Sequence, residues 1–148
     1  MTKWLTPSEM AAWRPFIETY ADLINALERD LAEHDMTLGD YQVLVYLSEA
    51  DDRSMRMCDL ASLLQLSPSG LTRRLDGLVK TGYVSRAAST EDRRVMNATL
   101  TDAGAEALSA TAPFHVASVR RHVFDHLDAD QVDALASIFG AIGAGLSS

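Results

Sequence analysis

The most constraining feature of this sequence is a pair of short helical segments joined by a tight turn, between residues 57 and 81. The first segment is predicted to be a helix over Met57–Leu64. Ser67-Pro68 then has the pattern of an N-cap followed by proline at the first helical position of a second helix. One face of this second helix is predicted to be buried, because it carries leucines at helical spacing, Leu71, Leu75 and Leu78. The segment therefore predicts a helix-turn-helix.

A basic β-hairpin is predicted directly after the second helix. Gly82 has the place of a C-cap glycine, and two strand-like segments, Tyr83–Ala87 and Val95–Leu100, flank the polar stretch Ala88–Arg94. Two helices followed by such a hairpin form a winged helix-turn-helix, in which a recognition helix enters the major groove of DNA and the hairpin tip reaches a minor groove. Hairpin chemistry alone leaves an alternative of equal weight, a solvated turn whose charges pair with each other.

The tip of the hairpin carries a candidate arginine for the minor groove. Residues two apart point the same way in extended chain, so Asp92 is predicted to lie beside Arg94 while Arg93 faces elsewhere. In this arrangement Asp92 would hold the guanidinium of Arg94 in place for insertion.

The charge distribution separates this segment from the rest of the chain. Over 148 residues, 13 Lys and Arg stand against 21 Asp and Glu, and the net charge of −8 argues against a protein coated in basic charge. Residues 53–101 hold eight basic and four acidic residues, a net of +4, which leaves −12 for the remainder. Such asymmetry is typical of a surface that meets a polyanion, although basic side chains that merely solvate a surface would give the same count.

The sequence resembles the MarR (multiple antibiotic resistance regulator) family of transcription factors over nearly its whole length. The matching stretches are Asp59-Leu60-Ala61, residues 66–73 (LSPSGLTR), residues 78–84 (LVKTGYV), Asp92-Arg93-Arg94 and Leu100-Thr101-Asp102-Ala103-Gly104. The resemblance implies an obligate homodimer of triangular outline, a recognition helix at residues 67–81 and a wing at residues 83–100. It also implies repression that a small ligand relieves, and a wing-tip pair formed by Arg94 and its orienting residue Asp92.

Two helices are predicted ahead of the helix-turn-helix. Residues 6–9 (TPSE) have the pattern of an N-cap and capping box, and an apolar stripe follows as far as Leu31. Pro15 falls inside this stripe, so a kink or a break is expected near Ala11 and Ala12. A shorter helix is predicted from its N-cap Thr37 to the polar turn at residues 51–54.

Two more helices are predicted after the hairpin, with N-caps at Thr101 and Asp128 and a kink at Pro113. In the last helix, apolar residues alternate at spacings of three and four, Val132, Leu135, Phe139, Ile142 and Leu146. This spacing is typical of a helix that packs on other helices. We favour packing between two copies of the chain over packing within one subunit, because few elements remain to cover both terminal stripes.

These features predict one mainly α-helical domain, residues 1–148, with a small β-hairpin wing. Residues 37–101 would form the winged helix-turn-helix, and residues 1–36 and 102–148 would form an intertwined dimerisation region. The predicted function is a homodimeric repressor that binds double-stranded DNA at an inverted-repeat operator. The alternative is a winged-helix protein-interaction module without DNA binding. The predicted DNA-binding residues lie on the recognition helix and the wing: Ser67, Ser69, Thr72, Arg73, Arg74, Arg86, Asp92, Arg93 and Arg94.

The sequence argues against an enzyme, a metal site or a cofactor. It has no Gly-rich phosphate loop, nucleophile elbow or zinc-protease motif. His122 and His126 have ligand-like spacing, but the sequence offers no identifiable third ligand. Cys58 is the single cysteine, and its place early in the first helix of the helix-turn-helix favours a packing or semi-exposed small residue over redox sensing.

Neither a membrane span nor a signal peptide is expected, which predicts a cytoplasmic protein. The longest nearly apolar stretch, residues 138–146, is far shorter than the roughly 20 residues that a transmembrane helix needs. The N-terminal segment lacks the uninterrupted apolar core of a signal peptide.

Evidence for a ligand pocket is confined to aromatic and imidazole side chains on three predicted helices. Such side chains at helical spacing are also ordinary core residues. If they line a pocket, it would suit a small planar aromatic or phenolic effector. The pocket candidates are Trp13, Phe16, Tyr20, Tyr41, Phe114 and His115.

Overall fold

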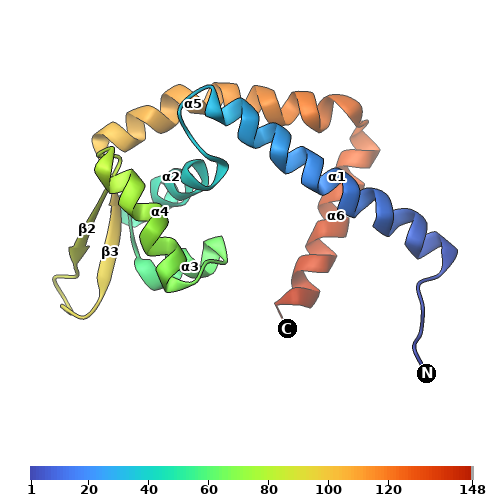
Figure 1. Cartoon of the computed structure of the whole chain (residues 1–148), viewed down its shortest axis with the longest axis horizontal. Helices are drawn as coiled ribbons and strands as arrows, with labels where there is room; N and C mark the ends of the chain where they lie inside the picture. The colour runs from blue at the N-terminus through green and yellow to red at the C-terminus, as the bar shows by residue number, and fades with distance from the viewer. Residues whose placement is uncertain (148) are drawn as a thin grey trace. The chain divides into compact units, whose positions relative to one another are not determined.

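The computed structural model describes residues 1–147 as six α-helices and one small antiparallel sheet (Figure 1). The mainly helical fold with a β-hairpin is thereby confirmed. The helices are α1 (Pro7–Ala32), α2 (Leu38–Glu49), α3 (Met57–Leu64), α4 (Pro68–Lys80), α5 (Asp102–His122) and α6 (Ala129–Leu146). The strands are β1 (Ser54–Arg56), β2 (Val84–Ala88) and β3 (Met96–Leu100), and two 3-10 turns lie at Asp51–Arg53 and Phe124–His126.

The predicted helix starts are confirmed by their capping bonds. Thr6 and Glu9 bond each other's backbone amides in a capping box, with side-chain to amide distances of 2.7 and 3.2 Å. The hydroxyl groups of Thr37 and Ser67 accept from the third amide of α2 and α4, at 3.0 and 3.1 Å. Asp128 forms a second capping box at the start of α6. Local sequence thus decides where these helices begin.

The chain divides into two compact units, and residues 28–114 form the unit with the larger core. Leu71, Leu75 and Leu78 of α4 are 1%, 0% and 4% exposed, so the predicted buried face of this helix is confirmed. They share a core with residues of α2, α3 and the hairpin, including Leu44, Leu47, Leu60, Val84 and Leu100. This core holds the helix-turn-helix and the base of the hairpin together.

The sheet of this unit has the order β1-β3-β2, all antiparallel. The two hairpin strands each begin one residue later than predicted, and the loop between them projects from the helices (Figure 1). Gly82 precedes the hairpin with a φ of 82°, a conformation that glycine adopts without steric cost. The strand β1 was not predicted, because three residues are too few to show an alternating pattern.

The start of α5 is fixed to the base of the hairpin. The amide of Thr101 donates to the carbonyl of Tyr83 at 3.1 Å, and its hydroxyl donates to the carbonyl of Gly82 at 2.6 Å. A Cβ on Gly104 would overlap the carbonyl oxygen of Tyr83, so this close approach requires glycine. These contacts explain the stretch at residues 100–104 that resembles the MarR family.

The second unit comprises residues 1–27 and the chain from His115 onward. Among the described residues, its only buried apolar side chains are Ala26 and Leu27, and α6 has none. α1 continues through Pro15, so of the two alternatives near Ala11 and Ala12 the break is excluded, and the kink stays a prediction. α5 continues through Pro113, where a kink also stays a prediction. No helix within residues 1–147 has both the length and the apolar run needed to cross a bilayer.

Candidate nucleic-acid interface

The N-terminal turn of α4 presents small polar side chains whose hydroxyl groups also serve the helix. Ser67 Oγ accepts from the amide of Gly70 at 3.1 Å and lies 3.2 Å from Ser69 Oγ. Thr72 Oγ1 donates to the carbonyl of Pro68 at 3.0 Å. All three hydroxyl-bearing residues are exposed. This turn can therefore come close to another surface, and Ser69 carries the hydroxyl with no bond to the backbone of the helix.

Arg73 and Arg74 are neighbours on α4 but lie in different surroundings. Arg73 is exposed, and within residues 1–147 it forms no ion pair. Arg74 is half-buried, and its Nη1 donates to Thr37 Oγ1 at 3.2 Å and to Asp40 Oδ1 at 3.3 Å. Arg73 is thus available to a partner molecule, whereas Arg74 is engaged by α2.

Arg86, on β2, is also engaged within the unit. Its Nη2 lies 2.8 Å from Oδ1 of Asp76, which projects from α4. The arginine side chain is only 26% exposed, whereas that of Asp76 is 56% exposed. This ion pair joins the recognition helix to the wing, and it adds a carboxylate to the outer surface of α4.

The tip of the wing is a tight turn, and the prediction of extended chain at Asp92 and Arg94 is wrong. The amide of Val95 donates to the carbonyl of Asp92 at 3.0 Å, which places Arg93 and Arg94 in the middle of a β-turn. Aspartate is favoured at the first position of such turns because its carboxylate accepts from an amide two residues on. Here the amide of Arg94 donates to Asp92 Oδ1 at 3.0 Å.

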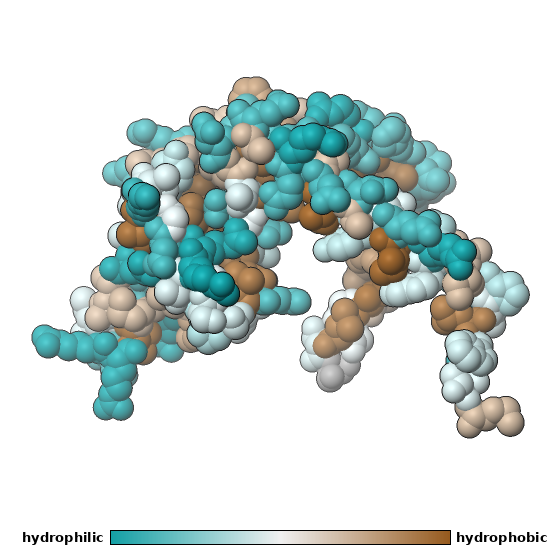
Figure 2. All heavy atoms as spheres, in the orientation of Figure 1, coloured by the Kyte–Doolittle hydropathy of each residue, from teal (hydrophilic) through white to brown (hydrophobic). Residues whose placement is uncertain are grey.

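The carboxylate of Asp92 therefore shapes the turn more than it holds the guanidinium. Nε of Arg94 lies 4.0 Å from Asp92 Oδ1, and the arginine side chain is 95% exposed. Arg93 is also exposed and forms no ion pair within residues 1–147. Figure 2 shows hydrophilic side chains projecting from the hairpin tip, where these two arginines lie. The tip presents two positive charges on a short, defined turn.

The six pocket candidates divide between the two units: Trp13, Phe16, Tyr20 and His115 belong to one, and Tyr41 and Phe114 to the other. Trp13, Phe16 and Tyr20 form a ladder of ring contacts on α1, with centroids 5.9 and 6.3 Å apart. Tyr41 lies in the core of the larger unit, where burial raises the pKa of its hydroxyl. Phe114 stacks on His34 with a centroid distance of 4.2 Å.

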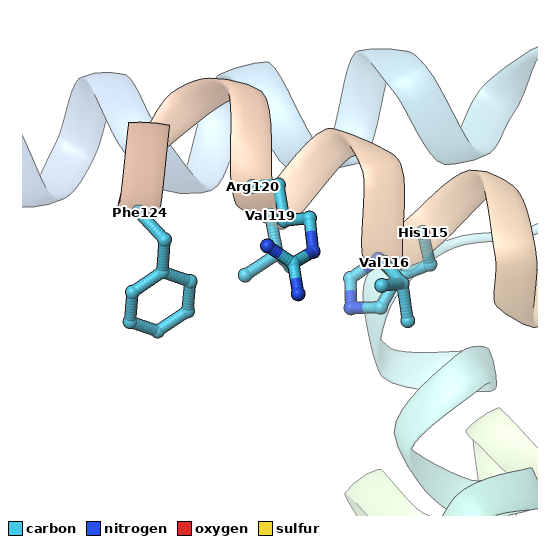
Figure 3. A pocket seen from close by; sticks show the side chains of 5 residues that line it. All are labelled: His115, Val116, Val119, Arg120 and Phe124. Carbon is cyan, nitrogen blue, oxygen red and sulfur yellow. The ribbon is translucent and has the colours of Figure 1, made fainter. Parts of the chain in front are cut away.

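His115 lines a cavity. A pocket of about 490 Å³ is lined by His115, Val116, Val119, Arg120 and Phe124, which project from one side of α5 and the turn after it (Figure 3). Burial lowers the pKa of His115, which favours the neutral imidazole at physiological pH. The two valines, Arg120 and Phe124 were not among the residues predicted from sequence to line a pocket. Their spacing on one helix face would have pointed to them.

Neither Cys58 nor the histidine pair forms a chemical site in the described structure. Cys58 is exposed in the first turn of α3, 3.7 Å from Asp59 Oδ1. His122 ends α5 while His126 lies in the following 3-10 turn, so the two do not share a helix face. The ligand-like spacing considered for this pair therefore does not correspond to a shared surface.

Comparison with known proteins agrees with this arrangement. The sequence model of the MarR family matches residues 34–95. AbsC, a MarR family transcriptional regulator from Streptomyces coelicolor, is 38% identical, with a TM-score of 0.93 over 99% of each chain. The chain belongs to the MarR family. Sco3205, a MarR family regulator from the same organism solved in complex with DNA, is 37% identical, with a TM-score of 0.95 over 100% of this chain and 93% of that one.

A further relative is the HTH-type transcriptional repressor YetL of Bacillus subtilis (strain 168). It is 27% identical over 123 residues, which cover 83% of this chain and 73% of that protein. The chain is therefore a DNA-binding transcriptional regulator of the MarR family and not an enzyme. The alternative of a winged-helix module without DNA binding is set aside.

The turn at the wing tip generates a prediction. Arg94→Ala should weaken binding to operator DNA by about 1–3 kcal/mol, because the shortened side chain no longer reaches the groove. Asp92→Asn should retain most of the binding, since the amide oxygen of asparagine can still accept from the Arg94 amide. Asp92→Ala should weaken binding, but little further when Arg94→Ala is already present. Fluorescence anisotropy titrations of all four variants test this, and equal losses for Asp92→Asn and Asp92→Ala would show that the charge itself is needed.

Proposed function

We propose that this protein is a homodimeric repressor that binds an inverted-repeat operator. In each subunit α4 would enter the major groove and the wing an adjacent minor groove. The observation that carries the proposal is the exposure of Arg73, Arg93 and Arg94 on these two elements of one unit. Within residues 1–147, only Arg94 among them forms an ion pair, with Nε 4.0 Å from Asp92 Oδ1.

The surroundings of the exposed residues on α4 and the wing support a specific contact with DNA for each. The exposed turn at Ser69, Thr72 and Arg73 would meet base edges and phosphates, with the amides of the helix start favouring phosphate nearby. Arg94 would read the minor groove, and Arg93, beside it on the turn, would contact a phosphate. The DNA complex of Sco3205 supports DNA binding by this fold, and the name of YetL supports repression.

The operator is predicted to be recognised in a salt-sensitive manner. If the dimer neutralises about six to ten phosphates, affinity should fall by roughly 10³ to 10⁵ between 50 and 200 mM salt. A footprint on the DNA upstream of its own gene should protect two half-sites whose centres lie about one helical turn apart. Equal binding to random duplex of the same length, or affinity that does not change with salt, would contradict the proposal.

The homodimer is supported by apolar surface that one subunit does not cover. The helix α6 is predominantly apolar. Three of its large side chains are nevertheless about half exposed, with values of 53%, 47% and 49% for Ile138, Phe139 and Ile142. Figure 2 shows hydrophobic side chains along α6 on the face in view. The aromatic ladder of α1 is also largely exposed, and Phe16 contacts Phe139 with ring centroids 5.9 Å apart. Exposed apolar surface of this extent is typical of an interface, and a second copy presents the same surface.

Dimerisation and folding are therefore expected to be coupled. Light scattering should report twice the chain mass at micromolar concentration, and deletion of residues 131–148 should give an aggregating or unfolded chain. A milder variant, Ile142→Glu, should weaken the dimer without removing a helix. A well-folded, soluble monomer after the deletion would contradict an interlocked dimer.

We further propose that a small aromatic carboxylate acts as the effector. The cavity beside α5 has apolar walls from Val116, Val119 and Phe124, which suit a planar ring. Arg120 provides a cation that can bind a carboxylate with two parallel hydrogen bonds. A neutral His115 could bond a phenolic hydroxyl group. A role in effector binding stays a prediction for the other five pocket candidates, Trp13, Phe16, Tyr20, Tyr41 and Phe114.

The effector proposal is tested with benzoate and 4-hydroxybenzoate as probes. Each should lower the affinity of the protein for its operator, and Arg120→Ala should abolish this response while leaving affinity without the probe unchanged. Arg121→Ala is the matched control, because this neighbouring arginine does not line the cavity. A response that survives in Arg120→Ala would place the effector elsewhere, and no response in the unaltered protein would contradict the proposal.

A further inference from the structure

The guanidinium of Arg74 lies over the first turn of α2. Its Nη1 donates to Thr37 Oγ1 at 3.2 Å and to Asp40 Oδ1 at 3.3 Å. Thr37 Oγ1 also accepts from the amide of Asp40 as the N-cap of α2, at 3.0 Å. One threonine hydroxyl thus joins the start of α2 to a side chain of the recognition helix, 37 residues further along the chain.

Gly39 provides the space that the guanidinium occupies. A Cβ on Gly39 would overlap Nη1 and Cζ of Arg74. The arginine is therefore packed against the backbone of α2 as well as hydrogen-bonded to its cap and to Asp40. The side chains of Arg74 and Asp40 are 31% and 26% exposed, so this ion pair is better shielded from water than the Arg94–Asp92 contact at the wing tip.

These contacts oppose a role for Arg74 in binding phosphate. To reach a phosphate, its guanidinium would have to leave a half-buried carboxylate and uncover the first turn of α2. Arg73, the next residue on the same helix, is exposed and can bind DNA without breaking any ion pair within residues 1–147. The two arginines therefore differ in function despite their adjacency.

We propose that Arg74 is a positioning residue, which fixes the rotation of α4 against α2 so that Ser69, Thr72 and Arg73 face the DNA. Burial of the leucine face holds α4 against the core. It does not by itself fix the rotation of α4 to within a few degrees, because apolar packing is non-directional. Hydrogen bonds from one guanidinium to two acceptors on α2 are directional and add this constraint. Recognition residues need such support, since productive contacts tolerate errors of only about 0.5 Å. The inference rests on the proposed DNA recognition through α4.

The first test measures stability without DNA. Gly39→Ala in a helix ordinarily raises stability, but here the added methyl group would displace the guanidinium. We expect Gly39→Ala to raise Tm by less in the unaltered chain than in the Arg74→Ala chain, where the gain should be roughly 2–4 °C. Gly77→Ala, where a Cβ would have open space, is the matched control and should change Tm equally in both chains. An equal rise in Tm for Gly39→Ala in both chains would overturn the packing on which the inference depends.

The second test separates positioning from phosphate binding. The probes are a duplex selected from a random library by the unaltered protein, and an unrelated duplex of equal length. Arg73→Ala should reduce the slope of log affinity against log salt by about 0.9 for each phosphate that the bound dimer no longer neutralises. Arg74→Ala should leave the slope unchanged, weaken binding to the selected duplex by about tenfold, and change binding to the unrelated duplex little.

Two conservative variants, Arg74→Lys and Asp40→Asn, also distinguish positioning from phosphate binding. Arg74→Lys should not restore binding to the selected duplex, because an ammonium group lacks the flat guanidinium that packs over Gly39, whereas a phosphate contact would tolerate lysine. Asp40→Asn should weaken binding to the selected duplex. If Arg74 instead bound phosphate, this change would strengthen binding by freeing the guanidinium.

A reduced salt slope for Arg74→Ala, rescue by Arg74→Lys or tighter binding by Asp40→Asn would each overturn the positioning role while leaving DNA recognition intact. Failure of the unaltered protein to select any duplex would overturn the proposed function together with this inference. The two failures are therefore distinguishable.

Discussion

Burial of the leucine face of α4 is the constraint on which the rest of the structure depends. Leu71, Leu75 and Leu78 are almost completely inaccessible, and they draw α2, α3 and the base of the wing into one core. Successive helical residues are rotated by about 100°, so this burial also decides which side chains face outward. Arg73 is directed to solvent, and Arg74 falls at the edge beside α2. The hydrophobic core thus sorts two chemically identical neighbours into different surroundings, and the polar contacts of α2 then refine the placement of the helix.

Features that depend on neighbours in sequence could be predicted, whereas those that depend on distant contacts could not. The N-caps at Thr37, Ser67 and Asp128 follow from local hydrogen bonding, and the leucine face follows from helical spacing. The strand β1 exists because β3 pairs with it, which no local pattern reveals. The same holds for the Arg74 and Arg86 ion pairs, whose carboxylates lie on other elements. At the wing tip the error was local, because the turn preference of aspartate outweighed the expectation of extended chain.

The two units differ in how many of their own apolar side chains they bury. The unit of residues 28–114 buries most of its leucines, whereas the other leaves most of its apolar and aromatic side chains exposed. A helix such as α6, with Ile138 and Ile142 about half exposed, gains little by folding against its own subunit. The proposed dimer would supply the missing burial. It would also couple the stability of each subunit to the presence of two recognition helices, as an inverted-repeat site requires.

The distribution of arginines explains how an acidic protein can bind an acidic polymer. Residues 53–101 carry a net charge of +4 in a chain of −8, yet Arg53, Arg74 and Arg86 are each paired with a carboxylate of the same subunit. Paired arginines add little to the long-range attraction of DNA, because the field of each is largely cancelled by its partner. Of the eight basic residues, Arg56, Arg73, Lys80, Arg93 and Arg94 remain for DNA, and three of these, Arg73, Arg93 and Arg94, lie at the start of the recognition helix and at the wing tip. Two copies of these three would neutralise about six phosphates, the lower end of the range for strongly salt-dependent binding.

Attraction would then be appreciable only when both elements are seated in their grooves, while the surplus negative charge elsewhere disfavours non-specific association. Discrimination in such a protein would depend on the placement of α4 and the wing more than on total charge, and two of the paired arginines connect these elements, Arg74 joining α4 to α2 and Arg86 joining the wing to α4.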